Sequence, residues 1–200
     1  MGWTTQTVAG VTKTLCLQDG EWTCQMAATA TVINRYGGGQ PTENAIVQRS
    51  RQNVGGYQTP VQERPGFRQA LPGMAIPPPR QPSGVGTYNQ NMVPTLEAYK
   101  IAAAETGSPS FNVLQNAMNH ASQQRPLVLR EPSHIVVCEG PWPGVAGSYI
   151  ICDPGRGLNQ AQLANGNPHP QLQYGGQQFP IDRMWTTAPD TRPEYRTQVM

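Results

Sequence analysis

Four residues of this 200-residue chain have side chains that together could carry out acyl transfer: Gln18, Cys24, His134 and Asp153. A cysteine thiolate is a strong nucleophile, a histidine can accept and return a proton, and a carboxylate can orient the histidine. A side-chain amide near the nucleophile can bind the oxyanion that develops on the attacked carbonyl. A lone glutamine in a glutamine-rich chain carries no information, but the short spacing from Gln18 to Cys24 gives it weight.

Cys24 opens the clearest helical segment of the sequence. The residues CQMAATATVINRY at 24–36 follow Thr23, a candidate N-cap, and end at three glycines, 37–39. A thiol in the first helical turn faces unpaired backbone N–H groups and the positive end of the helix dipole, which favour the thiolate. Most cysteines are small buried hydrophobic residues, and that alternative stays open for Cys24. The polar residues just before it favour a helix that starts at a surface cleft.

His134 is the histidine best placed to serve as a base. It opens the apolar segment IVVC, where a strand can hold a side chain rigidly at the end of a sheet. His120 lies at the end of an expected helix, and His169 lies in a proline-flanked loop. For these two histidines a structural or solvated role is the better interpretation.

Asp153 is linked to His134 by the register of an expected hairpin. If segments 134–139 and 148–153 pair with Glu139 opposite Ser148, then His134 lies opposite Asp153. Directly opposed residues share a face, with Cβ atoms about 4.5 to 5.5 Å apart. The Asp-Pro-Gly sequence is also ordinary turn chemistry, and a register shift of one residue would separate the pair.

The remaining elements predict an α+β fold, with helices first and an antiparallel sheet second. A helix is expected behind Ser110, where Phe111, Leu114 and Met118 share one face. Two further helices are expected at 42–52 and 95–105, and strands at 127–131, 134–140, 148–153 and 178–185.

Length and composition indicate one domain over residues 1–186. A Pro/Gly/Gln-rich insertion loop is expected at 53–91 and a C-terminal extension at 187–200. Hydrophobic residues make up 37% and charged residues 13%, with a net charge of +2, so neither nucleic acid nor an anionic membrane is an expected partner.

The chain is expected to be soluble and leaderless, because it has no apolar run of about 20 residues and no signal-peptide pattern at its start. Its four cysteines form no C-x-x-C pair. No structural zinc site, other metal site or cofactor is therefore expected, and the cysteines are read as mostly reduced thiols.

Three segments together resemble the papain-like cysteine peptidases: Gln18-x5-Cys24 at the head of CQMAATATVINRYGG, then SHIVVCEG, then YIICDPGRG. The sequence is most similar to bacterial branches, namely the bacteriocin-processing (double-glycine) peptidase domains of ABC exporters and secreted effector peptidases. The resemblance covers about residues 15–185 in order and length. It implies a papain-like fold, with the nucleophile helix packed on a C-terminal antiparallel sheet. It also implies that Cys24 is the nucleophile, His134 the general base and acid, Asp153 the orienting carboxylate and Gln18 the oxyanion donor.

The implied reaction is hydrolysis of peptide bonds in a protein or peptide substrate through a thioester intermediate. A thiol deamidase, transglutaminase or acyltransferase would use the same groups, and a non-catalytic binding module is an alternative from another class. The resemblance is compatible with a bacterial effector or toxin that is cytoplasmic in the producer and then secreted or injected into a target cell. Such a toxin implies a protein inhibitor or immunity protein as a partner.

Overall fold

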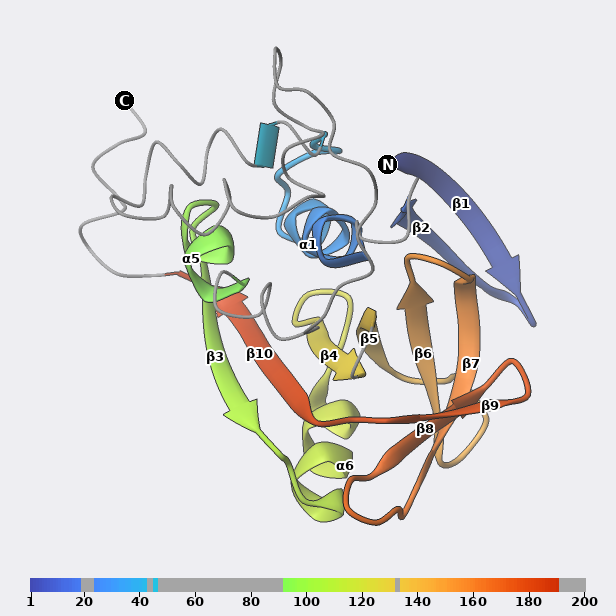
Figure 1. Ribbon diagram of the computed structural model, residues 1–200. Coiled ribbons are helices and arrows are strands. Elements are labelled where there is room, and N and C mark those ends of the chain that lie inside the picture. The colour runs from blue at the N-terminus through green and yellow to red at the C-terminus, as the bar shows by residue number, and fades with distance from the viewer. Residues whose placement is uncertain (19–23, 43–44, 47–91, 132–133, 191–200) are drawn as a thin grey trace, which may run out of the picture.

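The computed structural model describes residues 1–18, 24–42, 45–46, 92–131 and 134–190 (Figure 1). The insertion loop expected at 53–91 lies outside the described residues, as does nearly all of the helix expected at 42–52.

The chain begins with a two-stranded hairpin that the sequence analysis did not predict. Strands β1 (Gly2–Val8) and β2 (Val11–Leu17) pair antiparallel, from Gly2 opposite Leu17 to Val8 opposite Val11. The turn residues Ala9 and Gly10 both have positive φ, 43° and 82°, as a tight two-residue hairpin turn requires. Threonines along both strands supply the β-branched side chains that favour extended backbone.

The main sheet has eight strands among the described residues, and every neighbouring pair is antiparallel. Its order is β3-β10-β4-β5-β6-β7-β8-β9 (Figure 1). The strands are β3 (Ile101–Gly107), β4 (Leu127–Glu131), β5 (His134–Pro141), β6 (Ser148–Asp153), β7 (Gly157–Ala164), β8 (Gln171–Tyr174), β9 (Gln177–Pro180) and β10 (Arg183–Pro189).

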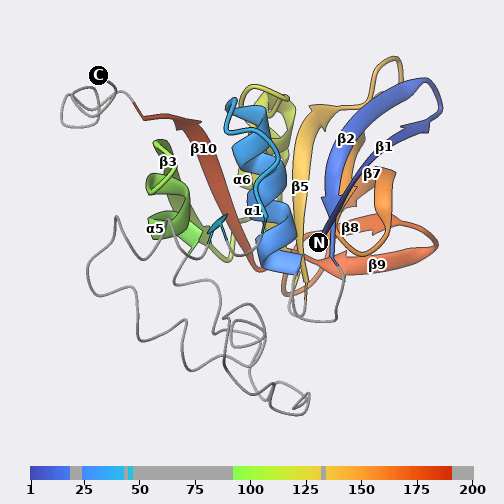
Figure 2. The same ribbon diagram turned by 90° about the horizontal axis from the view of Figure 1, so that it is seen from above.

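Both faces of this sheet are covered, which explains why β5 and β6 are buried along most of their length. Helix α1 (Cys24–Arg35) packs on one face, against a core that includes Ile135 and Val137. Helix α6 (Phe111–His120) packs on the other, against a core that includes Val136 and Cys138. Figure 2 shows α1 running beside the sheet, between the short helix α5 (Met92–Glu97) and the β1–β2 hairpin.

Helix α1 is confirmed where the sequence predicted it, and it is buried on nearly every side from Gln25 to Ile33. Its small residues allow this close packing, because Ala27, Ala28 and Ala30 are fully buried. Thr31 connects the helix to the hairpin, since its hydroxyl accepts the Cys16 N–H at 3.0 Å and donates to the Ala27 carbonyl at 3.0 Å.

Helix α6 is also confirmed. The Ser110 side chain accepts the Val113 N–H at 3.4 Å and caps the first turn, while Leu114 and Met118 face the core.

The helix predicted at 95–105 is wrong. Helix α5 ends at Glu97, Lys100 has a positive φ of 61°, and residues 101–107 form the edge strand β3. Pairing with β10 supplies backbone hydrogen bonds that outweigh the helix propensity of three consecutive alanines.

The strand predicted at 178–185 is two strands, β9 and β10, separated by Ile181 and Asp182. Strand β10 continues to Pro189, so the expected boundary at 187 falls inside a strand, and residues 191–200 lie outside the described part. The strands predicted at 127–131, 134–140 and 148–153 are confirmed, and the architecture is α+β in general.

Candidate active site

His134 and Asp153 meet at one end of the main sheet. His134 is the first residue of β5 and Asp153 the last residue of β6. The His134 Nε2 lies 2.6 Å from Asp153 Oδ1, so this ring nitrogen donates its proton to the carboxylate. The contact fixes the ring orientation and leaves Nδ1 free to face another group.

The register that produces this contact differs from the predicted one by two residues. Val137 pairs with Cys152 and Cys138 with Ile151, and a bulge lies between Cys138 and Pro141. The predicted direct pairing of His134 with Asp153 is therefore wrong, and the two residues are diagonal neighbours. A shift of two keeps both side chains on the same face, because side chains alternate with a period of two.

Asp153 is completely buried, and four donors surround its two oxygens. Oδ1 accepts the backbone N–H groups of Gly155 at 2.7 Å and Arg156 at 3.1 Å in addition to His134. Oδ2 accepts from the Tyr174 hydroxyl at 2.9 Å. Burial alone would raise the pKa of Asp153, but the hydrogen bond and charge of His134, the Gly155 N–H and Tyr174 lower it below its usual value. Asp153 is thus held ionised.

Cys24 is a second partner of the His134 ring. It is the first residue of α1, its side chain is partly exposed, and it hydrogen-bonds with His134. Because Asp153 engages Nε2, Nδ1 is the ring nitrogen that remains for a second partner. Burial acts to lower the pKa of His134, but the hydrogen bonds to Asp153 and Cys24, together with their charges, raise it to about 10. The ring is therefore favoured in its protonated form beside the Asp153 carboxylate.

Gln18 is held at the same place by the turn that follows β6. Its backbone N–H donates to the Pro154 carbonyl at 2.9 Å. A Cβ placed on Gly155 would lie 3.5 Å from Asp153 Oδ1, 3.6 Å from His134 Cε1 and 3.7 Å from the Gln18 carboxamide carbon. The Gln18 amide, the imidazole and the carboxylate thus converge on one glycine. Gln18 Oε1 is buried and makes no hydrogen bond in the described structure.

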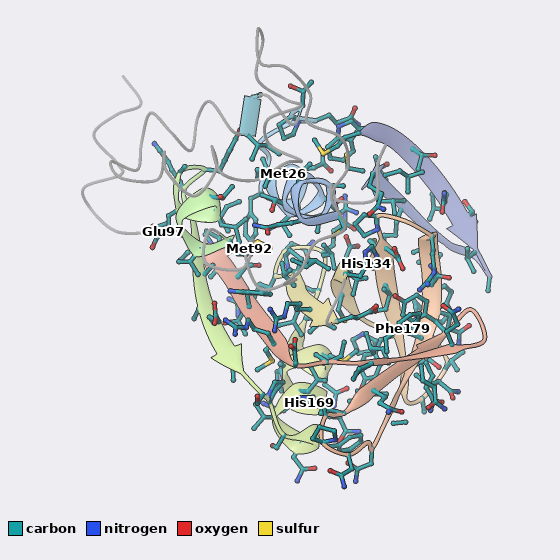
Figure 3. The ribbon with its side chains drawn as sticks, viewed as in Figure 1. Met26, Met92, Glu97, His134, His169 and Phe179 are labelled. Atoms are coloured by element: carbon teal, nitrogen blue, oxygen red, sulfur yellow. The ribbon has the colours of Figure 1, made fainter. Side chains whose placement is uncertain are left out.

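The structure brings together all four residues singled out from the sequence, and it separates the other two histidines from them. His120 ends α6, where its Nδ1 lies 2.8 Å from the Asn116 carbonyl oxygen. His169 is well removed from His134 (Figure 3). The candidate N-cap Thr23 lies outside the described residues.

Glu131 and Tyr174 belong to the same cluster and were missed by sequence reasoning. Glu131 pairs directly with His134 across β4 and β5, and the Tyr174 hydroxyl lies 2.9 Å from Glu131 Oε1. The sequence signal for Glu131 was an acidic residue at the end of an expected strand, three positions before the histidine. Tyr174 had no comparable signal.

All four cysteines are free thiols, and Cys16, Cys138 and Cys152 are buried. Among the described residues, no group of three or more His, Cys, Asp or Glu side chains is arranged to hold a metal ion. Within the same residues, no helix has the length and apolar character needed to cross a membrane.

Comparisons of the chain with protein-family models, with curated proteins and with solved structures gave no match. The site is therefore interpreted from its own geometry and chemistry.

Proposed function

We propose that this protein is a cysteine peptidase with a Cys24–His134–Asp153 triad and a papain-like architecture. The observation that carries the proposal is the position of His134, whose ring bonds through Nε2 to a buried ionised carboxylate and also interacts with the thiol at the start of a helix. A thiol, an imidazole and a carboxylate in this order are the minimum set for nucleophilic acyl transfer.

The reaction follows from these positions. Cys24 thiolate attacks the peptide carbonyl, and the tetrahedral oxyanion is bound by the Gln18 side-chain amide and the backbone N–H of Cys24. The imidazolium of His134 protonates the leaving amine, which leaves an acyl-enzyme thioester on Cys24. His134 then takes a proton from water, which attacks the thioester and releases the acid and the Cys24 thiolate, so that the thiolate and the imidazolium are restored. Asp153 holds the imidazole in place and stabilises its charged form through both steps.

The first test is intact-mass labelling with one equivalent of iodoacetamide across pH 4 to 9. We expect one adduct to form quickly below pH 7 in the wild type and to be absent in Cys24→Ala, which retains the other three thiols as an internal control. Labelling that rises only near pH 8.5, the usual range of a free thiol, or that survives the mutation, contradicts the proposal.

A matched pair of histidine variants tests the base. His134→Ala should abolish fast labelling, whereas His120→Ala, which alters an exposed histidine at the end of α6, should leave it unchanged. Equal effects of the two substitutions would contradict the role assigned to His134.

The products distinguish the proposed hydrolysis from related thiol chemistry. Peptide libraries incubated with the active protein should yield new N-termini. A gain of about one dalton without cleavage would instead indicate a deamidase, and coupling to an added amine or acyl acceptor would indicate a transglutaminase or acyltransferase. A protein that labels at Cys24 but forms none of these products would support the binding-module alternative.

The biological setting that we propose, a secreted bacterial effector or toxin with an inhibitory immunity protein, rests on the sequence resemblance. Its test is expression of the wild type and Cys24→Ala in the cytoplasm of a susceptible cell. Toxicity that depends on Cys24 supports it, and equal growth of both strains contradicts it.

A further inference from the structure

Behind the triad, one phenol is shared by two buried carboxyl groups. The Tyr174 hydroxyl lies 2.9 Å from Asp153 Oδ2 and 2.9 Å from Glu131 Oε1. Exposed fractions are 0% for Asp153, 3% for Glu131 and 4% for Tyr174, so water does not screen the three groups. Alternation along β4, β6 and β8 places all three on the face of the sheet that carries α6.

These three groups need two protons between them to make both hydrogen bonds, and the phenol alone supplies one. A phenol has one proton and can donate to one carboxylate at a time. If both acids were ionised, one buried carboxylate would face the lone pairs of the phenol oxygen, which is unfavourable at low dielectric. If one acid is protonated, it donates to the phenol oxygen and the phenol donates to the other acid, so every group is satisfied.

Glu131 is the acid that takes the proton. Asp153 is stabilised as an anion by His134 and by the backbone N–H groups of Gly155 and Arg156, whereas Tyr174 is the one hydrogen-bond partner that the described structure gives the Glu131 carboxyl. Burial raises the pKa of Glu131 to about 7, despite the opposing effects of Tyr174 and His134.

We propose that Glu131 and Tyr174 are positioning residues that form a switch. The protonation state of Glu131 determines whether Tyr174 donates its hydrogen bond to Asp153 or to Glu131. When Glu131 is neutral, its proton lies on the phenol oxygen and Tyr174 donates to Asp153. When Glu131 is ionised, Tyr174 turns its proton to Glu131 and Asp153 loses one donor. Asp153 then accepts more strongly from His134, which favours the imidazolium. The role of this switch in catalysis rests on the proposed function, but the switch itself does not.

The charged and titratable groups around Glu131 come from three strands and one turn. They are His134 on β5, Asp153 on β6, Tyr174 on β8 and Arg156 after β6. The Arg156 guanidinium does not bond to Glu131, because it lies over the Phe179 ring at 4.5 Å and donates to Gln177 Oε1 at 2.7 Å. Its nearest approach to Asp153 is 3.8 Å from a half-exposed side chain. Among the described residues, no cation bonds directly to Glu131 and holds it ionised.

The test is NMR of the histidine ring signals between pH 5 and 9. The chain has three histidines, so His134 is assigned by its loss in His134→Ala, and His120 and His169 serve as internal references. In the wild type we expect the His134 ring signals to shift with a midpoint near pH 7. This shift should be absent in Glu131→Gln, whose amide keeps a donor on the phenol oxygen at every pH. It should also be absent in Tyr174→Phe.

Tyr149→Phe is the matched control, because Tyr149 is an equally buried tyrosine whose hydroxyl donates to Asn119 Oδ1 at 2.9 Å, away from the triad. It should keep the wild-type shift. A wild-type His134 signal without a step near pH 7, or a step that persists in Glu131→Gln, overturns the switch. A step lost in Glu131→Gln but kept in Tyr174→Phe overturns the part assigned to Tyr174.

The NMR result does not depend on turnover, so it separates this inference from the proposed function. Fast Cys24 labelling without a Glu131-dependent step would leave the peptidase proposal standing and overturn the switch. A Glu131-dependent step in a protein with an unreactive Cys24 would support the switch and overturn the peptidase proposal. Where both hold, the rate of Cys24 alkylation should show the same midpoint in the wild type and lose it in Glu131→Gln.

Discussion

Two buried carboxylate clusters in the described part of the chain lie near opposite ends of β5, and their charge balances are opposite: cations are in excess in one and acids in the other. Glu139, near the end of β5, is one carboxylate between two cations: Arg35 Nε lies 2.5 Å from Oε1 and Lys13 Nζ 2.8 Å from Oε2. At the start of β5, two carboxyl groups, Glu131 and Asp153, share one tyrosine, and His134 bonds to Asp153.

This difference in charge balance suits the two clusters to different roles. The Glu139 cluster holds elements of the fold together, whereas we propose that the cluster at His134 exchanges a proton. Glu139 joins three elements, because Lys13 is on β2 and Arg35 ends α1, where it also donates to the Thr14 carbonyl at 2.5 Å. In this cluster the cations outnumber the one carboxylate. The cluster at His134 has an excess of acids, and such an excess is resolved by protonation. Buried carboxylates near the two ends of one strand can thus have different roles, according to the number of cations beside them.

The largest effect that we expect is on catalysis, in Asp153→Asn. The amide cannot stabilise the imidazolium or hold the same tautomer, so kcat should fall by ~10³- to 10⁴-fold. The measurement is the rate of peptide cleavage, together with a urea unfolding curve to establish that the variant is folded. A loss of less than tenfold would contradict the role of Asp153.

The same variant gives a pH test with a defined sign. The folded-state pKa of His134, about 10, exceeds the ordinary value of 6.5, so the stabilisation from its charged form is complete below pH 6.5 and disappears as the pH rises towards 10. The stability difference between wild type and Asp153→Asn should therefore shrink over that interval. A difference that is constant from pH 6 to 10 would contradict the ion pair.

The next largest effect is on stability, in Glu139→Gln. Removing this charge leaves Arg35, with a side chain only 3% exposed, without its counter-ion, so the free energy of unfolding should fall by about 3 to 5 kcal/mol. Urea unfolding at pH 7 measures it. A loss as small as that of a surface pair would show that the cluster is not what fastens the hairpin to α1.

Glu131→Gln should have a smaller effect that depends on pH. The pKa of Glu131, about 7, lies above its ordinary value of 4.5, so the native state binds an extra proton and loses stability as the pH rises from 4.5 to 7. The variant lacks that loss. It should match the wild type near pH 5 and exceed it by about 3 kcal/mol above pH 7. Unfolding curves at pH 5 and 8 test this, and equal stabilities at pH 8 would contradict it.

The smallest effect should come from Glu105→Gln. This substitution removes the partly exposed ion pair between Glu105 and Arg183, which belongs to neither cluster. Glu105 and Arg183 are each about one third exposed, so their ion pair should contribute less than about 1 kcal/mol. Urea unfolding beside Glu139→Gln gives the comparison directly. Equal losses would show that burial does not separate the two kinds of pair.

The sequence predicted those parts of the molecule whose signals are local. Helix α1 follows from its alanine-rich segment and terminal glycines, and α6 from Ser110 and its apolar spacing. The contact of His134 with Asp153 was predicted despite a register error of two residues, because an even shift leaves both side chains on one face.

What could not be predicted depends on contacts between distant residues. Residues 101–107 have a helical composition, and only pairing with β10 makes them a strand. Glu131 and Tyr174 are 43 positions apart and meet because β8 folds back over the face that carries Asp153. No periodicity in either segment marks such a meeting.

The place of β10 in the sheet has a consequence for synthesis. This strand lies between β3 and β4, although its residues follow those of the other strands in the described part of the chain. In that part, β10 is the one strand that pairs with β3. The ribosome adds about 5 to 20 residues per second, and β3 cannot pair with β10 until residues 183–189 have been synthesised. A chain that terminates before that point lacks the strand that joins β3 to β4. A nascent chain would therefore complete its fold late, after every residue of the Cys24 site has already been made.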